Sequence, residues 1–268
     1  MRTTHKEGGL RLRQGARSTP PLVSIISVVF RASRELPRLI ESVAAQKGDD
    51  SEFIIIDGGS DDGTLDILRQ FDDVIDYWVS EPDRGIYDAM NKGIAAATGE
   101  FVLHLNAGDA LIFIPREELR EFLAKDIDVA CFKVLMAGWG EYRPKTGFLR
   151  NLQYIDNIWH HQGQFYRRGR HPGYDLRYRT YADFDCNQRM FKARKSLETS
   201  QTLVAEQYEV GVSGSGSYWE VFRIVRSNFG IGCAMLAMVW RSLAGLRYRL
   251  KHLLTWWESQ KNKSTAGS

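Results

Sequence analysis

The sequence predicts an α/β fold in which helices flank a mostly parallel central sheet. Apolar runs of strand length alternate with segments of helical spacing through the first half of the chain. Two of these runs pass directly into acidic, glycine-rich turns, one at Asp57 and one near Asp109. Such alternation gives parallel strands joined by right-handed crossovers. Because ligands of these sheets bind beyond the carboxyl ends of the strands, we expect a ligand crevice there.

The individual elements follow from local composition. Residues 22–30 (LVSIISVVF) form a nearly continuous β-branched run, which is typical of a strand buried on both faces. Leucine, isoleucine and valine recur at helical spacing through residues 35–46. Further strands are expected at residues 53–57, 74–79, 101–105 and 127–136, and from residue 204. Further helices are expected at residues 65–71, 86–97 and 115–125 and from near residue 186.

Charge and cysteine content limit the class of protein. The 268 residues suffice for one substantial core, and a net charge of +3 gives no indication of nucleic-acid binding. Residues 1–20 carry about +4 and residues 220–268 about +6, so the middle is acidic. Three unclustered cysteines argue against a disulfide framework and fit a reducing compartment. Residues 1–20, polar and without an apolar run, are expected to be a disordered basic lead-in; a membrane-touching arm is the alternative.

The most specific pattern lies in residues 81–109, EPDRGIYDAMNKGIAAATGEFVLHLNAGD. It combines a turn containing proline and glycine, a run of good helix formers, a short apolar strand and an acidic break. Together with the VSIISVVF and IIIDGGSDDGT segments, it resembles the bacterial family-two glycosyltransferases, in particular a subgroup that builds exopolysaccharide and lipopolysaccharide. The resemblance covers about residues 22–228 and implies the GT-A fold, a Rossmann-like nucleotide-binding domain.

The resemblance also implies a nucleotide-sugar pocket. From the residues alone, Asp57 and its glycine-rich turn fit either a capped tight turn or a nucleotide pocket that the backbone can approach. On the family match, Asp57 contacts the base and Asp62 occupies another recurrent acidic position. The other implied donor-side residues are Asp83, Arg84, Asp88 and Asn106. For Arg84 the alternative is a solvated helix face.

A metal site is expected at Asp109. A carboxylate after a strand is a natural ligand of a hard cation, and a helix cap is the alternative. The match aligns residues 106–109 (NAGD) with the family's metal-binding Asp-x-Asp-Asp, of which only the last carboxylate remains. It therefore implies Mg²⁺ or Mn²⁺ at Asp109, bound more weakly than by the full motif.

The second half of the chain is expected to supply the acceptor side. Residues 159–168 (WHHQGQFYRR) resemble the family's His-Gln-x-x-Phe segment, which implies His161 and Gln162 on the acceptor wall. We expect the rings of His160 and His161 to point to opposite faces of a strand, so that both would not bind one ion. A hydrogen-bonded structural role is the alternative for His161.

Transfer of a sugar to a hydroxyl requires one general base. From the residues alone, Asp183 and Asp185 are equivalent candidates, and helix caps are the alternative for both. The match to the family's Tyr-x-x-x-x-Asp-Tyr/Phe-Asp/Glu element selects Asp183 as the base and leaves Asp185 on the acceptor side. Gly211 and Ser213 correspond to a Gly-Gly-Val-Ser element that would offer backbone N–H groups to a phosphate; a flexible surface loop is the alternative.

The C-terminal tail carries an apolar stripe at spacings of three and four residues. Its members are Leu236, Val239, Leu243, Leu246, Leu250, Leu253 and Trp257, and basic residues flank them. An interfacial membrane helix, a helix packed on the body and a coiled-coil seam all remain open. We therefore expect a basic lead-in (1–20), a GT-A domain (21–228) and a helical tail (229–268).

The predicted protein is an inverting glycosyltransferase at the cytoplasmic face of the membrane. It would move a sugar from a GDP- or UDP-sugar to a hydroxyl of a lipid-linked saccharide in exopolysaccharide or lipopolysaccharide synthesis, using Mg²⁺ or Mn²⁺. A colanic-acid-type transferase is the nearest pattern. The alternative is a non-catalytic sugar- or nucleotide-binding protein on a degenerate fold of this family. A nucleotidyltransferase is a weaker rival, because the first loop (FRAS, residues 30–33) lacks a Gly- and Lys-rich phosphate-binding sequence.

Overall fold

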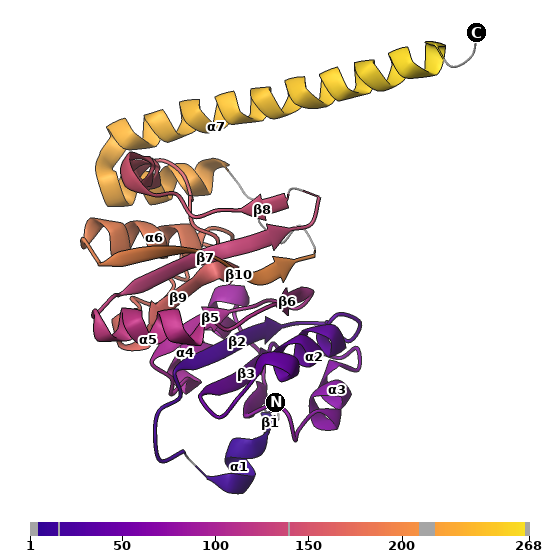
Figure 1. The fold of residues 1–268 in the computed structure, drawn as a ribbon, viewed down its shortest axis with the longest axis vertical. Helices are drawn as coiled ribbons and strands as arrows, with labels where there is room; N and C mark the ends of the chain where they lie inside the picture. The colour runs from indigo at the N-terminus through magenta and orange to yellow at the C-terminus, as the bar shows by residue number, and fades with distance from the viewer. Residues whose placement is uncertain (1–4, 16, 139, 209–217, 266–268) are drawn as a thin grey trace.

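The computed structural model describes residues 5–15, 17–138, 140–208 and 218–265, and for residues 244–265 it describes the backbone alone. The described strands form one mixed sheet in the order β1-β4-β3-β2-β5-β9-β7-β10-β6, with β8 paired to β7 (Figure 1). The strands are β1 (Lys6–Gly8), β2 (Val23–Val29), β3 (Ser51–Asp57), β4 (Tyr77–Ser80), β5 (Phe101–His104), β6 (Asp109–Leu111), β7 (Val129–Met136), β8 (Gly140–Tyr142), β9 (Gln164–Arg167) and β10 (Leu197–Gln207).

The helices cover both faces of this sheet. They are α1 (Leu10–Gln14), α2 (Leu36–Gln46), α3 (Thr64–Gln70), α4 (Ile86–Ala96), α5 (Arg116–Ala124), α6 (Ala182–Lys192) and α7 (Tyr218–Thr265), with 3-10 turns η1 (Gly147–Tyr154), η2 (His161–Gly163) and η3 (Arg168–Arg170). The alternation of side chains along β2 places Ile25 in the core under α2, α3 and α5 and Ile26 in the core under α4, α6 and α7.

The predicted parallel unit is confirmed. Strands β4, β3, β2 and β5 pair in parallel, and all seven residues of β2 are buried. The second half of the sheet is mixed, because β9 runs antiparallel to both β5 and β7. β10 begins at Leu197, seven residues before the predicted strand, since its first half is polar and only partly buried and so lacks the apolar pattern.

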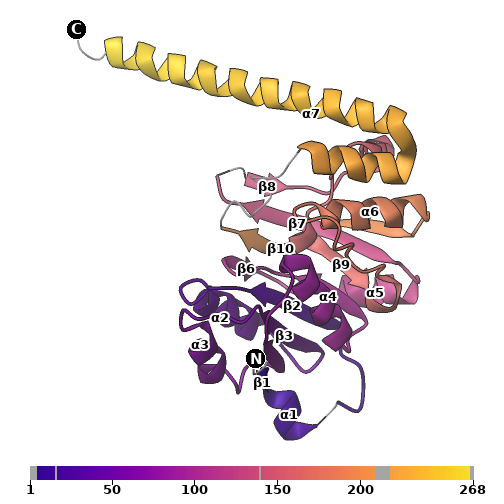
Figure 2. The same cartoon turned by 180° about the vertical axis from the view of Figure 1, so that it is seen from behind.

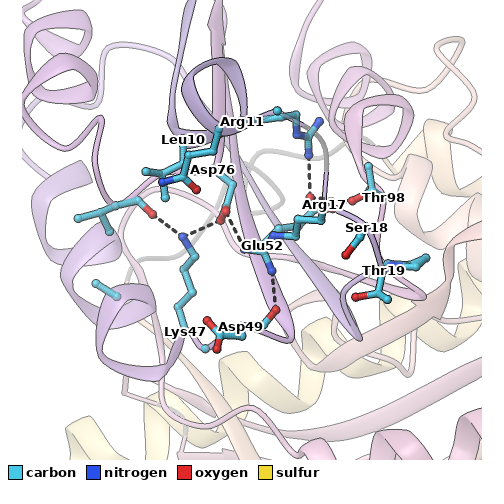
Figure 3. A pocket seen from close by; sticks show the side chains of 16 residues that line it. Leu10, Arg11, Arg17, Ser18, Thr19, Lys47, Asp49, Glu52, Asp76 and Thr98 are labelled. Atoms are coloured by element: carbon cyan, nitrogen blue, oxygen red, sulfur yellow. Dashed lines mark hydrogen bonds and ion pairs between the residues drawn. The ribbon is translucent and has the colours of Figure 1, made fainter.

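The basic N-terminal segment differs from the predicted disordered lead-in. β1 pairs with the outer edge of β4, and α1 follows it. Arg11 donates to the Ala96 carbonyl. Arg11 also bonds to Glu52, and Arg17 bonds to Asp76 (Figure 3). These anionic partners are more than 40 residues away in sequence, so the composition of residues 1–20 alone could not indicate them.

Glu52 connects several segments at this end of the sheet through hydrogen bonds. Its side chain is buried and accepts hydrogen bonds from Ser24 Oγ, from the Thr98 backbone and hydroxyl, and from Arg11. One carboxylate therefore connects β2, β3, the N-terminal segment and the turn between α4 and β5.

Replacement of this carboxylate tests the connection. We expect Glu52→Gln to lower the free energy of unfolding by about 3 kcal/mol, because an amide N–H₂ would face buried donors and leave Arg11 unpaired. Urea unfolding is the measurement, with the exposed Glu41→Gln on α2 as the control. Equal stability of the two variants would contradict the central role of Glu52.

α7 bends at Gly230, whose φ of 88° lies outside helical geometry. Before the bend, Val221, Ile224 and Val225 are fully buried against the body. After the bend the helix runs across the molecule and projects beyond it (Figures 1 and 2). The bend falls two residues beyond the predicted end of the GT-A domain at residue 228.

Candidate active site

A crevice opens at the carboxyl ends of β2 and β5, where the sheet order changes direction. It consists of two adjoining pockets, of about 730 Å³ and about 160 Å³, which share Ile86, Asn106 and Gln207 as lining residues. The larger pocket is lined by Val28, Val29, Phe30, Gly58, Asp83, Gly85, Ala89, Ala107, Asp109 and Gln162 in addition. The smaller pocket is lined by Tyr87, Met90, Tyr142, Asn157, Trp159, His160, His161, Arg179, Thr180, Tyr181 and Asp183 in addition.

Asp109 lies on the wall of the larger pocket and is almost fully buried. One carboxylate oxygen accepts hydrogen bonds from the Asn106 backbone (2.9 Å) and from Gln162 Nε2 (3.0 Å). Its other oxygen accepts none from the described residues. Burial is the largest effect on this group and raises its pKa to about 6. Asp109 is thus a carboxylate without a cationic partner among the described residues.

Asp183 lies in the first turn of α6, on the wall of the smaller pocket. Tyr87 OH shares its proton between one carboxylate oxygen (3.0 Å) and the Thr180 carbonyl (2.7 Å), and Asn157 Nδ2 donates to the other carboxylate oxygen at 3.0 Å. Burial raises the pKa of Asp183, and these hydrogen bonds partly offset the effect. The carboxylate is therefore held in one orientation by neutral donors and is a better proton acceptor than an exposed aspartate.

Two side chains connect Asp183 with Asp109. His161 Nε2 lies 3.1 Å from Asn106 Nδ2, and His161 Nδ1 lies 3.9 Å from the Asp183 carboxylate. Burial lowers the pKa of His161 to about 4, so the imidazole is neutral at pH 7. Asp109 and Asp183 thus line one crevice, whereas Asp57, the third acidic residue expected at the site, does not line it.

The two histidine rings contradict the predicted orientation. They stack with centroids 5.4 Å apart, and both line the smaller pocket. His161 begins the 3-10 turn η2 instead of continuing a strand, so the alternation of side chains does not apply.

The acidic turn after β3 serves a structural purpose in this structure. Asp57 is fully buried and accepts hydrogen bonds from Ser60 and Ser80, while its neighbour Gly58 lines the larger pocket. Asp62 accepts hydrogen bonds from Ser33 N and from Thr64, which hold its pKa well below the usual range. Neither side chain is among those lining the pocket, so the predicted base contact of Asp57 has no support in this geometry.

The predicted donor residues before α4 divide into two groups. Asp83 lines the larger pocket beside Gly58. Arg84 is exposed and pairs with Asp88, whose carboxylate also accepts from the Arg84 backbone. Arg84 and Asp88 therefore brace the turn, and only Asp83 forms part of the pocket wall.

Asp185 does not lie in the crevice. Its carboxylate accepts from Arg189 Nε (2.7 Å) and from Asn228 Nδ2 (3.0 Å), at the contact between α6 and α7. Two residues along a helix correspond to a rotation of about 200°, so Asp185 points away from the side that Asp183 faces. Gly211 and Ser213 lie outside the described residues.

Two residues that line the smaller pocket, Tyr87 and Asn157, were not predicted from the sequence. Tyr87 could have been predicted, because it belongs to the GIYD segment, residues 85–88, that resembles the family. Nothing in the sequence indicated Asn157, which precedes the histidine segment. Both hold the Asp183 carboxylate, and this function depends on contacts across 96 and 26 residues.

Comparisons with known proteins identify the family of this chain. The family model described as Glycosyl transferase family 2 matches residues 24–193. A PGL/p-HBAD biosynthesis glycosyltransferase of Mycobacterium bovis (strain BCG) is 34% identical over 204 residues, which cover 70% of this chain and 77% of that protein. An uncharacterized glycosyltransferase of Nostoc sp. is 37% identical over 90 residues, covering 32% of this chain and 28% of its own.

Two solved structures share the fold. S. aureus TarS 1–349 in complex with UDP-GlcNAc matches with a TM-score of 0.62 and 18% identity, over 77% of this chain and 66% of that one. Mannosyltransferase PcManGT from Pyrobaculum calidifontis, in complex with GDP-Man and Mn²⁺, matches with a TM-score of 0.56 and 16% identity, over 88% and 81%.

The architecture is therefore that of a GT-A glycosyltransferase, as predicted. Given the family model, which covers more than half of its length, the chain belongs to glycosyl transferase family 2. The exopolysaccharide subgroup stays a prediction, because the M. bovis relative is named for PGL/p-HBAD biosynthesis.

The buried, unpaired Asp109 predicts a pH-dependent stability. In the metal-free protein its pKa is raised from 3.8 to about 6, so the folded state retains the proton over a range where the unfolded state releases it. The free energy of unfolding should consequently fall as pH rises from about 4 to about 6. Relative to wild type, Asp109→Asn should gain about 2 kcal/mol between about pH 4 and pH 7.

Urea unfolding in EDTA measures this difference. The exposed Asp66→Asn, on the surface of α3, serves as the control and should follow the wild-type pH profile. Parallel profiles for Asp109→Asn and wild type would show that the carboxylate is not destabilised by burial.

Proposed function

We propose that this protein transfers a sugar from a nucleotide-sugar to a saccharide hydroxyl with inversion at the anomeric carbon. The observation that carries the proposal is the shared crevice of Asp109 and Asp183. The larger pocket has room for a donor beside Asp109, and the smaller pocket places Asp183 where an acceptor would enter. Family membership supplies the reaction class.

The residues around Asp109 fit a hard divalent cation. Asn106 Oδ1 and Gln162 Oε1 are buried without a hydrogen-bond partner, and one Asp109 oxygen is free among the described residues. Mg²⁺ and Mn²⁺ prefer such oxygen ligands. No cluster of three or more His, Cys, Asp or Glu ligands occurs in the described part of the chain. We therefore assign the metal to Asp109, assisted by these amide oxygens; when bound, it would offset the charge of the donor diphosphate.

The larger pocket suits the nucleotide. Phe30 is 60% exposed at its edge and offers an aromatic face for a base, and Gly58 allows close approach of the backbone. The neighbours TarS and PcManGT were solved with UDP-GlcNAc and GDP-Man, respectively, which supports a UDP- or GDP-sugar as the donor class.

Asp183 acts as the general base in this proposal. As the acceptor oxygen forms its bond to the anomeric carbon, the hydroxyl proton passes to Asp183 and the bond to the diphosphate oxygen breaks. Tyr87 and Asn157 keep the carboxylate aimed into the pocket. The acceptor that we propose is a lipid-linked saccharide of a bacterial surface polysaccharide. A non-catalytic sugar-binding protein is the rival, since the metal motif keeps one carboxylate.

The two aspartates of α6 provide a matched pair of variants. We expect Asp183→Asn to reduce transfer about 10³-fold with donor binding retained, because the general base is lost. Asp185→Asn should keep transfer within a few-fold of wild type and lower stability instead, because Asp185 pairs with Arg189 outside the crevice. Product formation and thermal unfolding, measured on both variants, check the assignment; undiminished transfer by Asp183→Asn would refute it.

Metal dependence gives a second test. EDTA should abolish transfer, and Mg²⁺ or Mn²⁺ should restore it in wild type but not in Asp109→Asn, whose neutral amide is a poor cation ligand. Product formation after EDTA treatment and metal addition measures transfer, and a thermal-shift screen of UDP- and GDP-sugars with and without Mn²⁺ measures donor binding. Metal-independent donor binding equal in both proteins would refute the assignment of Asp109.

A further inference from the structure

The outer face of α7 beyond Gly230 is apolar and uncovered. Leu236, Val239 and Leu243 are 61%, 56% and 54% exposed. Ala234 and Ala237, on the opposite side of the same helix, are fully buried against the body. The helix therefore packs through its small residues and presents its large ones to the surroundings, which is the reverse of the usual arrangement in a soluble protein.

The apolar spacing continues in the sequence beyond Leu243. The backbone stays helical to Thr265, and the spacing of three and four residues places the sequence positions Leu246, Leu250, Leu253 and Trp257 in line with the exposed stripe. Residues 242–263 contain five Lys and Arg but one Glu. An apolar stripe with basic flanks and a tryptophan is the composition of a helix that lies in a bilayer interface.

The structure disfavours two other occupants. Tyr218–Leu243 is apolar enough by length and composition to cross a membrane, but Val221, Phe222, Ile224 and Val225 bury one face of its first half against the body, and Gly230 bends it. Beyond Gly230 the run without charged residues ends before Arg241 and measures about 15 Å, too short for the hydrocarbon core. If a second copy of α7 covered this face, the basic residues beside the two stripes would face each other. A pair of helices is instead stabilised by opposite charges at these positions.

The inner side of the same helix contacts residues in and next to the wall of the smaller pocket. Trp240 Nε1 donates to Asp156 (3.0 Å), and Arg241 bonds to Asp156 (3.4 Å) and to Tyr181 OH (3.2 Å). Asp156 directly precedes Asn157, which holds the Asp183 carboxylate, and Tyr181 lines the smaller pocket. The helix is thus attached at the part of the crevice that would receive the acceptor.

We propose that the outer face of α7 binds an anionic lipid surface, and that Trp240 and Arg241 hold the smaller pocket beside that surface. The assignment of this pocket to the acceptor rests on the function proposed above, whereas lipid binding does not. A substrate carried on a lipid would then meet Asp183 without leaving the bilayer.

Vesicle sedimentation tests the surface. The wild-type protein should sediment with phosphatidylglycerol-containing vesicles at least tenfold more than with pure phosphatidylcholine vesicles. Leu236→Glu/Val239→Glu/Leu243→Glu should lose this binding. A control with three acidic substitutions at exposed sites on α1, α2 and α3, Gln14→Glu/Ala45→Glu/Gln70→Glu, should keep most of it, because these sites lie off α7.

Three results would overturn the proposal: no sedimentation of wild type, equal sedimentation with both vesicle types, or a wild-type dimer in lipid-free solution that the α7 triple variant converts to a monomer. The last would assign the face to a second copy. Donor binding, followed by thermal shift in the same variants, should be unchanged. A loss of donor response in wild type would count against the proposed function and leave the lipid result standing.

Hydrogen exchange tests the attachment. Anionic vesicles should slow amide exchange at residues 156–157 and 181 in wild type. Arg241→Gln should still sediment with vesicles but lose this protection, because its contacts to Asp156 and Tyr181 are weakened. If vesicles do not change exchange at these residues in wild type, lipid binding by α7 is not coupled to the smaller pocket.

Discussion

The parallel pairing of β2 on both of its edges determines where the crevice lies. From β2 the chain first adds β3 and β4 on one side, with α2 crossing one face of the sheet. It then returns through α4, on the other face, to place β5 at the opposite edge of β2. Right-handed crossovers in opposite directions must use opposite faces, so the loops at the carboxyl ends diverge. Phe30, Gly58 and Asn106 meet in the space that this divergence creates.

The charge environment separates the two proposed functional aspartates from the structural ones. Asp185 pairs with Arg189 one turn further along α6, and Asp88 pairs with Arg84 in the turn before α4. Asp109 is buried and the Asp183 side chain is 14% exposed; both are bonded to neutral donors, and no Lys or Arg of the described residues pairs with them. Burial consequently raises the pKa of both. Such groups gain stability when they bind a cation or a proton, which is what a metal ligand and a general base do.

The sequence predicted well those helices and strands that a single local pattern determines. The β-branched run of β2 and the helical spacing of α2 depend on residues that are neighbours in the chain. It did not distinguish Asp183 from Asp185 without the family match, because the difference between them is the direction in which each projects from α6. It also missed the folded N-terminal segment, whose arginines find Glu52 and Asp76 through the tertiary structure.

The two ends of the sheet show why volume alone does not identify the site. The crevice at the amino ends of β2 and β3, about 650 Å³, is comparable in size to the larger pocket at the other end. There, however, Glu52 is paired with Arg11, and Asp76 is paired with both Arg17 and Lys47 (Figure 3). Pairing within the protein leaves these acids little to gain from a ligand. At the carboxyl ends, Asp109 and Asp183 have no such partner among the described residues, so a cation or a proton bound there would meet carboxylates that the protein itself does not neutralise.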